Sequence, residues 1–196
     1  MSKLVVINHV TLDGVMQAPG RADEDTRGGF EHGGWAQPNN DEVMGRKMGE
    51  GMAEGGPLLF GRRTYEDFYG FWPNQADNPY TEVLNRVEKY VVSTSLSEPL
   101  PWSNSTLLSG VEAVAQLKER AGKAIGVLGS GELVQSLLRH GLVDELLLMI
   151  HPLVLGKGRR LFPQDGPPAT FRLADSVTTT TGVVIATYAL GGRRAE

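Results

Sequence analysis

One stretch constrains the fold of this chain more than any other, the sequence Gly-Val-Leu-Gly-Ser-Gly-Glu-Leu at residues 126–133. It continues an apolar run that favours a buried strand at 124–128, and it opens a segment with the apolar spacing of a helix. Its glycines allow the backbone to turn tightly and to approach a ligand. A helix that begins there offers free N–H groups and the positive end of its dipole. The stretch therefore predicts a strand–turn–helix unit, which is either a tight turn alone or a nucleotide pyrophosphate site.

The glycine turn does not complete either of the common phosphate-binding motifs. Gly129 and Gly131 begin a Gly-x-Gly-x-x-Gly pattern, but Val134 occupies the third glycine position. No strand that ends in an acidic residue follows at the required distance, and the absence of a Gly-Lys-Ser/Thr sequence excludes a P-loop. A dinucleotide held by this turn therefore requires a different fold.

Composition narrows the function classes. The 196 residues suit one domain, 1–196, with a proper core, and 40% hydrophobic with 21% charged residues is ordinary for a globular protein. A net charge of −4 argues against nucleic acid, and the absence of cysteine fits a cytoplasmic protein and excludes thiol chemistry. We expect no signal peptide, no membrane partner and, from the spacing of the four histidines, no metal site.

The order of the expected elements favours an α/β fold. Strands are expected at 4–10, 57–60, 90–92, 106–108, 124–128 and 145–150, with 151–155 extended and later strands at 171–174, 177–181 and 183–190. Helices are expected at 41–54, 79–87 and 111–120, after Gly61 and after the glycine turn. Strands alternate with helices to about residue 140, and only strands follow. This order predicts a mostly parallel central sheet with antiparallel C-terminal strands and helices on both faces.

Two other segments have open interpretations. Residues 14–40 show no periodicity and form either a functional lid or a disordered surface loop, and the aromatic residues Phe30 and Trp35 favour the lid. Three methionines at 44, 48 and 52 share one face of the expected helix 41–54. They favour a core contact over a surface that lines a flat ligand.

Three segments with phosphate-binding chemistry fall at the carboxyl ends of expected strands: Gly61–Thr64, Ser93–Ser95 and Gly129–Glu132. Each alone could be ordinary, as solvated arginines, turn hydroxyls or a tight turn. Ligands of open α/β sheets bind at the carboxyl ends of the strands, so the convergence favours a dinucleotide. One that carries an extra phosphate, NADP rather than NAD, would use all three.

The chain resembles the dihydrofolate reductase fold, and more closely its branch that includes the C-terminal reductase domain of bacterial riboflavin biosynthesis proteins. The motifs that carry the resemblance run in order from about residue 3 to 190. They are Leu12-Asp13-Gly14, Gly61-Arg62-Arg63-Thr64-Tyr65-Glu66, Val92-Ser93-Thr94, Val127-Leu128-Gly129-Ser130-Gly131-Glu132-Leu133, Asp144-Glu145-Leu146 and His151-Pro152-Leu153-Val154-Leu155-Gly156-Lys157-Gly158. The resemblance implies a three-layer αβα fold.

The resemblance also implies NADPH and hydride transfer to a polarised C=N or C=O of a flat heterocycle. Phosphates would be held at Gly61, Arg62 and Thr64, and the adenosine 2′-phosphate at Ser93 and Thr94. The pyrophosphate would lie on the backbone of the glycine turn, formed by Gly129, Ser130, Gly131, Glu132 and Leu133. Residues 15–35 would correspond to the active-site loop, with Met16 near the nicotinamide, and the substrate would meet Asn8, Asp13 and Trp35.

Three positions decide how far the comparison with dihydrofolate reductases holds. The helix carboxylate that anchors and helps to protonate the pterin matches Asp41, or next Glu42, although an acidic residue there is also a good helix cap. The arginine that clamps folate is replaced by Val87, with Arg86 beside it, which argues against folate as the substrate. Ser130 replaces one glycine of a Gly-Gly pair, which leaves open whether the 129–130 peptide is cis.

Two functions follow as hypotheses. The first is an NADPH-dependent reductase of a pterin- or pyrimidine-like heterocycle. Because the sequence contains no zinc-binding deaminase motif, we expect either a stand-alone reductase or a relative that acts on something else. The alternative is a non-catalytic dinucleotide-binding or assembly protein that retains the fold. A homodimer is also expected, through the late apolar strands and the basic loop at 156–160, with Leu147, Met149 and Leu153 at the interface.

Overall fold

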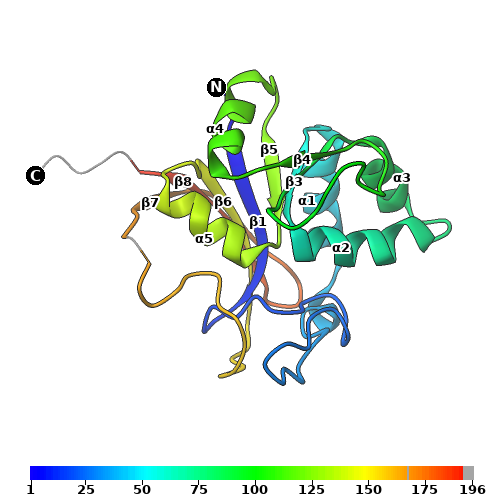
Figure 1. Ribbon diagram of the computed structural model, residues 1–196. Helices are drawn as coiled ribbons and strands as arrows, with labels where there is room; N and C mark the ends of the chain where they lie inside the picture. The colour runs from blue at the N-terminus through cyan, green and yellow to red at the C-terminus, as the bar shows by residue number, and fades with distance from the viewer. Residues whose placement is uncertain (167, 192–196) are drawn as a thin grey trace, which may run out of the picture.

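The computed structural model describes residues 1–166 and 168–191 and is built around one eight-stranded sheet (Figure 1). In spatial order the strands are β4 (Ser105–Leu108), β3 (Lys89–Val92), β2 (Leu58–Gly61), β5 (Ile125–Leu128), β1 (Leu4–Thr11), β6 (Glu145–His151), β8 (Val184–Leu190) and β7 (Phe171–Thr178). The strands from β4 to β6 are parallel, and β8 and β7 are antiparallel to their neighbours. This confirms a mostly parallel sheet that ends in antiparallel strands.

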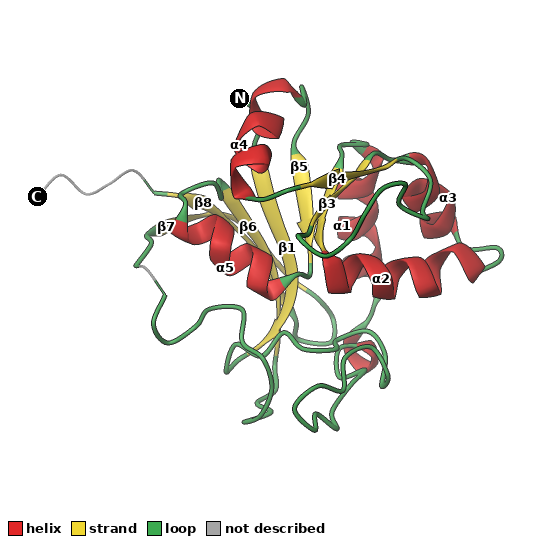
Figure 2. Ribbon diagram, viewed as in Figure 1, coloured by secondary structure: helices red, strands yellow, loops and turns green. Residues whose placement is uncertain are grey.

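Helices cover both faces of the sheet, which confirms the three-layer αβα fold (Figure 2). The helices are α1 (Glu42–Ala53), α2 (Arg62–Phe71), α3 (Pro79–Arg86), α4 (Val111–Arg120) and α5 (Gly131–Arg139), with short 3₁₀ turns at Gln37–Asn39 and Trp72–Asn74. Helices α4 and α5 pack on one face, where Leu4, Val6 and Val10 of β1 point. Helices α1, α2 and α3 pack on the other face, which Phe60, Val91 and Met149 occupy. Within the described residues, no helix is both long enough and apolar enough to cross a membrane.

The methionine face of α1 belongs to the core. Met44 is buried against Met149, Val183 and Ile185, and Met48 packs beside it. Met52 packs instead against the aromatic cluster around Phe60. The periodic methionines therefore fix α1 to the sheet, as the core interpretation expects.

The C-terminal strands and the segment after β6 differ from the sequence-based expectation. The two strands expected at 171–174 and 177–181 are one strand, β7, with a register shift between Leu173 and Asp175 that breaks the period-2 pattern. Strand β6 ends at His151, and the expected extension to 155 is a loop. The loop forms because the backbone N–H groups of Leu155 and Gly156 donate to the Asp13 carboxylate and not to a neighbouring strand.

Residues 14–40 form a packed loop and not a loose surface segment. Val15, Ala18, Phe30, Trp35 and Ala36 are buried together, and Leu153 and Leu155 of the later loop pack against them. The later loop passes so closely that a Cβ at Gly158, where φ is +118°, would lie 2.6 Å from Val15 Cγ1 and 2.8 Å from Phe30 Cε2. The two loops therefore form one structural unit beyond the carboxyl ends of β1 and β6.

Candidate functional site

Two of the three predicted phosphate segments are bonded directly to each other. The Gly61 N–H donates to Ser130 Oγ at 2.8 Å, and the Ser130 N–H donates to Thr64 Oγ1 at 3.1 Å. A Cβ at Gly129 would lie 3.2 Å from Thr64 Cγ2, so glycine permits the close approach. The start of α2 and the start of α5 therefore lie side by side at one edge of the sheet.

The glycine turn has a left-handed backbone and a trans peptide. Gly129 has φ of +54° and Ser130 has φ of +60°, and the one cis peptide within the described ranges is Glu98–Pro99. The serine hydroxyl donates to the Leu128 carbonyl at 3.0 Å, and the Asn8 amide donates to the Gly129 carbonyl at 3.3 Å. These bonds hold a conformation that an L-residue such as serine adopts at a cost.

The helix starts differ from one another in how they are capped. Asp41 caps α1 and Asn78 caps α3 through side-chain oxygens. By contrast, α2, α4 and α5 begin after Gly61, Gly110 and Ser130 and show no side-chain cap bond in the described part of the chain. The first N–H groups of a helix need acceptors, and uncapped ones favour an anion. Three uncapped helix starts thus face the edge where β2, β4 and β5 end.

A surface groove of about 450 Å³ lies beside the third segment. Its described lining includes Ser93 and Thr94 of that segment together with Ser109, and the Ser93 hydroxyl also accepts from the Ser95 and Leu96 N–H groups, both at 3.1 Å. Strand β3, which precedes them, pairs with β2 through Val92 and Gly61. None of the lining residues is a lysine or arginine and one is Glu98, whose carboxylate accepts from the Leu107 N–H.

Met16 lies against the start of α5. A Cβ at Gly131 would be 2.5 Å from its sulfur, so only glycine leaves room for the thioether there. The backbone of Met16 is held by its N–H, which donates to the Arg159 carbonyl at 2.9 Å. Met16, which the resemblance to the family puts near the nicotinamide, therefore adjoins the glycine turn.

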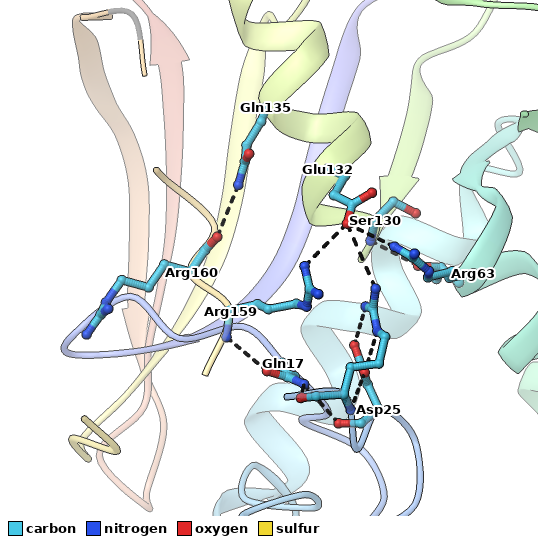
Figure 3. A network of polar contacts seen from close by, with 10 residues as sticks. Gln17, Asp25, Arg63, Ser130, Glu132, Gln135, Arg159 and Arg160 are labelled. Atoms are coloured by element: carbon cyan, nitrogen blue, oxygen red, sulfur yellow. Dashed lines mark hydrogen bonds and ion pairs between the residues drawn. The ribbon is translucent and has the colours of Figure 1, made fainter. Parts of the chain in front are cut away.

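Glu132, in the first turn of α5, gathers arginines from three segments (Figure 3). Its Oε1 lies 2.9 Å from Arg63 of α2, 3.3 Å from Arg159 and 3.9 Å from Arg27 of the 14–40 loop. Three guanidinium groups therefore lie close to the glycine turn. Among the residues that the structure describes, Arg62 by contrast has a single ion pair, 3.7 Å from Glu66 on its own helix.

The predicted substrate residues Asn8 and Asp13 are engaged in structural bonds. Asn8 is buried on the α4–α5 face and holds the glycine turn. The Asp13 carboxylate accepts from the Thr11 hydroxyl and from two N–H groups of the later loop, and these bonds lower its pKa to about 2. Both side chains therefore stabilise the backbone around the site.

Asp41 also has a full set of partners. Its carboxylate accepts from the Met44 N–H at 2.9 Å and from the N–H and hydroxyl of Thr180, both at 2.7 Å. These bonds, the one from Met44 foremost, lower the pKa of Asp41. The geometry is that of a helix cap that also ties α1 to the turn between β7 and β8.

A pair of histidines, of which His151 is buried and His9 half-buried, lies beside the predicted substrate residue Trp35. His9 Nδ1 is 2.9 Å from His151 Nε2, and the Trp35 ring meets His151 edge-on with centroids 5.1 Å apart. Burial lowers the pKa of His9 to about 3, with His151 adding to the effect, and burial alone lowers that of His151 to about 4. The sequence places His9 inside the strand expected at 4–10 and assigns it no role. A signal existed, since each histidine lies at or near the end of an apolar strand.

Comparisons with known proteins agree with this architecture. The chain matches the family described as RibD C-terminal domain over residues 2–185. It is 32% identical over 143 residues to the uncharacterized protein YyaP of Bacillus subtilis (strain 168), a match that covers 69% of this chain and 74% of that protein.

Two solved structures share the fold. A putative riboflavin biosynthesis protein from Shewanella sp. PV-4 superimposes with a TM-score of 0.71 at 23% identity, covering 98% of this chain and 100% of that one. A pyrimidine reductase-like protein from Corynebacterium diphtheriae gives a TM-score of 0.64 at 15% identity, covering 97% and 92%. The family match spans nearly all of the sequence, and the glycine turn, the sheet order and the three layers agree with it. The chain therefore belongs to the RibD C-terminal domain family.

Proposed function

We propose that this protein is an NADPH-dependent reductase of a flat pyrimidine- or pterin-like heterocycle. The observation that carries the proposal is the convergence of the uncapped starts of α2 and α5, cross-bonded through Ser130, at the carboxyl edge of the sheet. Membership of a family whose relatives are named for riboflavin biosynthesis and pyrimidine reduction supports a reductase.

The residues at this edge fit a dinucleotide with an extra phosphate. The backbone of Gly129–Leu133 would hold the pyrophosphate, with the N-terminal charge of α5 in support. Arg62 and the free hydroxyl hydrogen of Thr64 would donate to phosphates at the start of α2. Ser93 and Thr94 would hold the 2′-phosphate in the neighbouring groove, and Met16 would border the nicotinamide. The bound cofactor would supply a hydride, while the protein aligns the two rings and excludes water.

We assign Asp41 a positioning role and not proton donation, although the resemblance favours it as the catalytic carboxylate. Its oxygens already accept from Met44 and Thr180, and its lowered pKa keeps it ionised. The same observation favours the alternative function, a dinucleotide-binding protein without turnover, because the carboxylate that the resemblance assigns to proton donation is held by the protein's own groups.

Steady-state assays separate the two functions. Loss of dihydronicotinamide absorbance with candidate heterocycles supports the reductase, whereas tight NADPH binding with no turnover across the panel supports the alternative. Arg62→Ala should weaken NADPH much more than NADH, and Arg46→Ala, on the exposed side of α1, is the matched control. Equal losses for both nucleotides would reject the assignment of Arg62 to the extra phosphate.

We also propose a cytoplasmic homodimer, with a revised interface. Met149 is buried against Met44 within its own chain and Leu153 packs on the 14–40 loop, so these residues do not offer a free surface. Leu173, Val184 and Leu190 instead share one face of β7 and β8, with 52%, 37% and 46% exposed. Light scattering of the wild type and of Leu173→Glu tests this: the wild type should have twice the chain mass and the variant less.

A further inference from the structure

The histidine pair has a place in the fold that the cofactor site does not use. His9 lies on the face of β1 opposite Asn8, and His151 lies on the same face at the end of β6. Ile7, two residues before His9, pairs with Leu128, the last residue before the glycine turn. The pair therefore lies one strand away from the expected nicotinamide position, on the α1 side of the sheet.

The hydrogen-bond chain through the pair has one consistent direction. The Asn39 amide nitrogen, which can only donate, lies 3.4 Å from His151 Nδ1. A neutral imidazole has one donor and one acceptor, so Nδ1 of His151 accepts and its Nε2–H donates to His9 Nδ1. His9 then carries its own proton on Nε2.

The far end of this chain is open. Within the described residues, no protein group forms a hydrogen bond with His9 Nε2, and His9 is half-buried whereas His151 is fully buried. A relay that ends in one accessible N–H without a protein partner offers a donor to a ligand, and a ligand that covers this N–H without accepting from it leaves the donor unsatisfied at a cost.

We propose that His9 is the specificity-determining contact for the heterocycle, and that Nε2–H donates to a carbonyl oxygen or an unprotonated ring nitrogen. His151 and Asn39 are positioning residues that act through His9. An amino group at the same position of the heterocycle would present a second donor and would leave both donors unpaired. The inference rests on the proposed function, because it needs the heterocycle to lie beside the glycine turn.

Calorimetric binding of two matched heterocycles tests the proposal. One carries a carbonyl and the other an amino group at a single ring position, and each is titrated with and without NADP⁺. We expect the wild type to prefer the oxo compound by about tenfold or more, since each lost hydrogen bond leaves a buried donor. His9→Phe should lose that preference, and His9→Gln, which retains a donor, should keep much of it. His32→Gln, at an exposed histidine, is the control.

Several results would overturn the assignment. These are equal or tighter binding of the amino compound by the wild type, an unchanged preference in His9→Phe, or no binding of either compound. The affinity for NADPH is measured in parallel. If the wild type does not bind NADPH, the proposed function is wrong. If it binds NADPH but gives any of the three results above, only this inference is wrong.

A spectroscopic readout separates positioning from a merely structural role. Imidazole ¹⁵N shifts should show both His9 and His151 as Nε2–H tautomers. Asn39→Leu should mix the tautomers and reduce the preference for the oxo compound while NADPH affinity stays the same. An Nδ1–H tautomer at His9 would contradict the direction of the relay.

Discussion

Ser130 tests what stabilises the glycine turn, because its hydroxyl stabilises the turn whereas its backbone conformation destabilises it. The hydroxyl accepts from the Gly61 N–H at 2.8 Å and donates to the Leu128 carbonyl at 3.0 Å. The backbone, with φ of +60°, adopts a left-handed conformation that costs an L-residue about 1–2 kcal/mol. Alanine and glycine at this position both remove the bonds, but only glycine also removes the strain.

The expected magnitudes follow from these two terms. Ser130→Ala leaves the Gly61 N–H without its partner and should cost about 2 kcal/mol of unfolding free energy. Ser130→Gly should cost about 1 kcal/mol, because relief of the strain offsets part of the loss. For a chain of this size, about 1 kcal/mol corresponds to about 2–4 °C in Tm.

Urea unfolding followed by circular dichroism measures both variants. Ser136→Ala, in the middle of α5 with no side-chain bond in the described part of the chain, is the control and should change stability by no more than a few tenths of a kcal/mol. If the alanine and glycine variants were equally stable, the left-handed strain would be absent. If neither variant lost stability, the hydrogen bond from the Gly61 N–H to the Ser130 hydroxyl would contribute nothing to the free energy of unfolding.

Three further predictions concern stability. Gly49→Ala should raise the unfolding free energy by about 1 kcal/mol, since a Cβ in α1 meets open space there, and calorimetry would show any failure as an unchanged or lower Tm. Asp41→Ala should lower the Tm and leave NADPH affinity unchanged, and a selective loss of turnover would instead restore its catalytic role. The free energy of unfolding should fall as the pH drops from about 6.5 towards 4, by up to about 1.4 kcal/mol per pH unit for each of the two histidines. The reason is that His9 and His151 bind protons in this pH range when the chain is unfolded but not when they form the pair. Replacing His9 and His151 by apolar residues should flatten this slope in urea titrations, and His140→Gln, at an exposed position, should not.

Most of the fold could be predicted because its first two-thirds follow simple periodicities. The strands β1, β2, β3 and β5 are apolar runs bounded by turn residues, and Leu133, Val134 and Leu137 place the buried face of α5. After residue 150 the last strand and the antiparallel pairing were confirmed, but two details of the prediction were wrong. A register shift at 173–175 divides the period-2 pattern of β7, and the Asp13 carboxylate draws residues 155–156 into a loop.

The candidate site was predictable where backbone geometry carries it. Glycine at 129 and 131 reports tight approaches that the structure contains. The side chains were harder, because a polar residue in a sequence does not show whether a ligand or the protein will satisfy it. Asn8, Asp13 and Asp41 match functional positions by motif, but each bonds to the protein's own backbone.

The histidine pair shows the opposite case. His9 and His151 are 142 residues apart in the sequence, and they meet because β1 and β6 are neighbours in the sheet. Strand order is a property of the whole fold, so no local pattern reveals the contact. Asn39 and Trp35, from a segment without periodicity, complete the cluster only when that loop packs on the sheet.

The central claim, a dinucleotide phosphate site at the carboxyl edge of the sheet, is tested most directly by fluorescence titration with NADPH and, separately, with NADH. Energy transfer from the three tryptophans to the dihydronicotinamide reports binding of either nucleotide. The account predicts micromolar NADPH binding and NADH binding weaker by about tenfold or more, about 1.4 kcal/mol of preference for the extra phosphate. Equal affinities would place no phosphate at Arg62, Ser93 or Thr94, and the absence of binding by either nucleotide would contradict the reductase altogether.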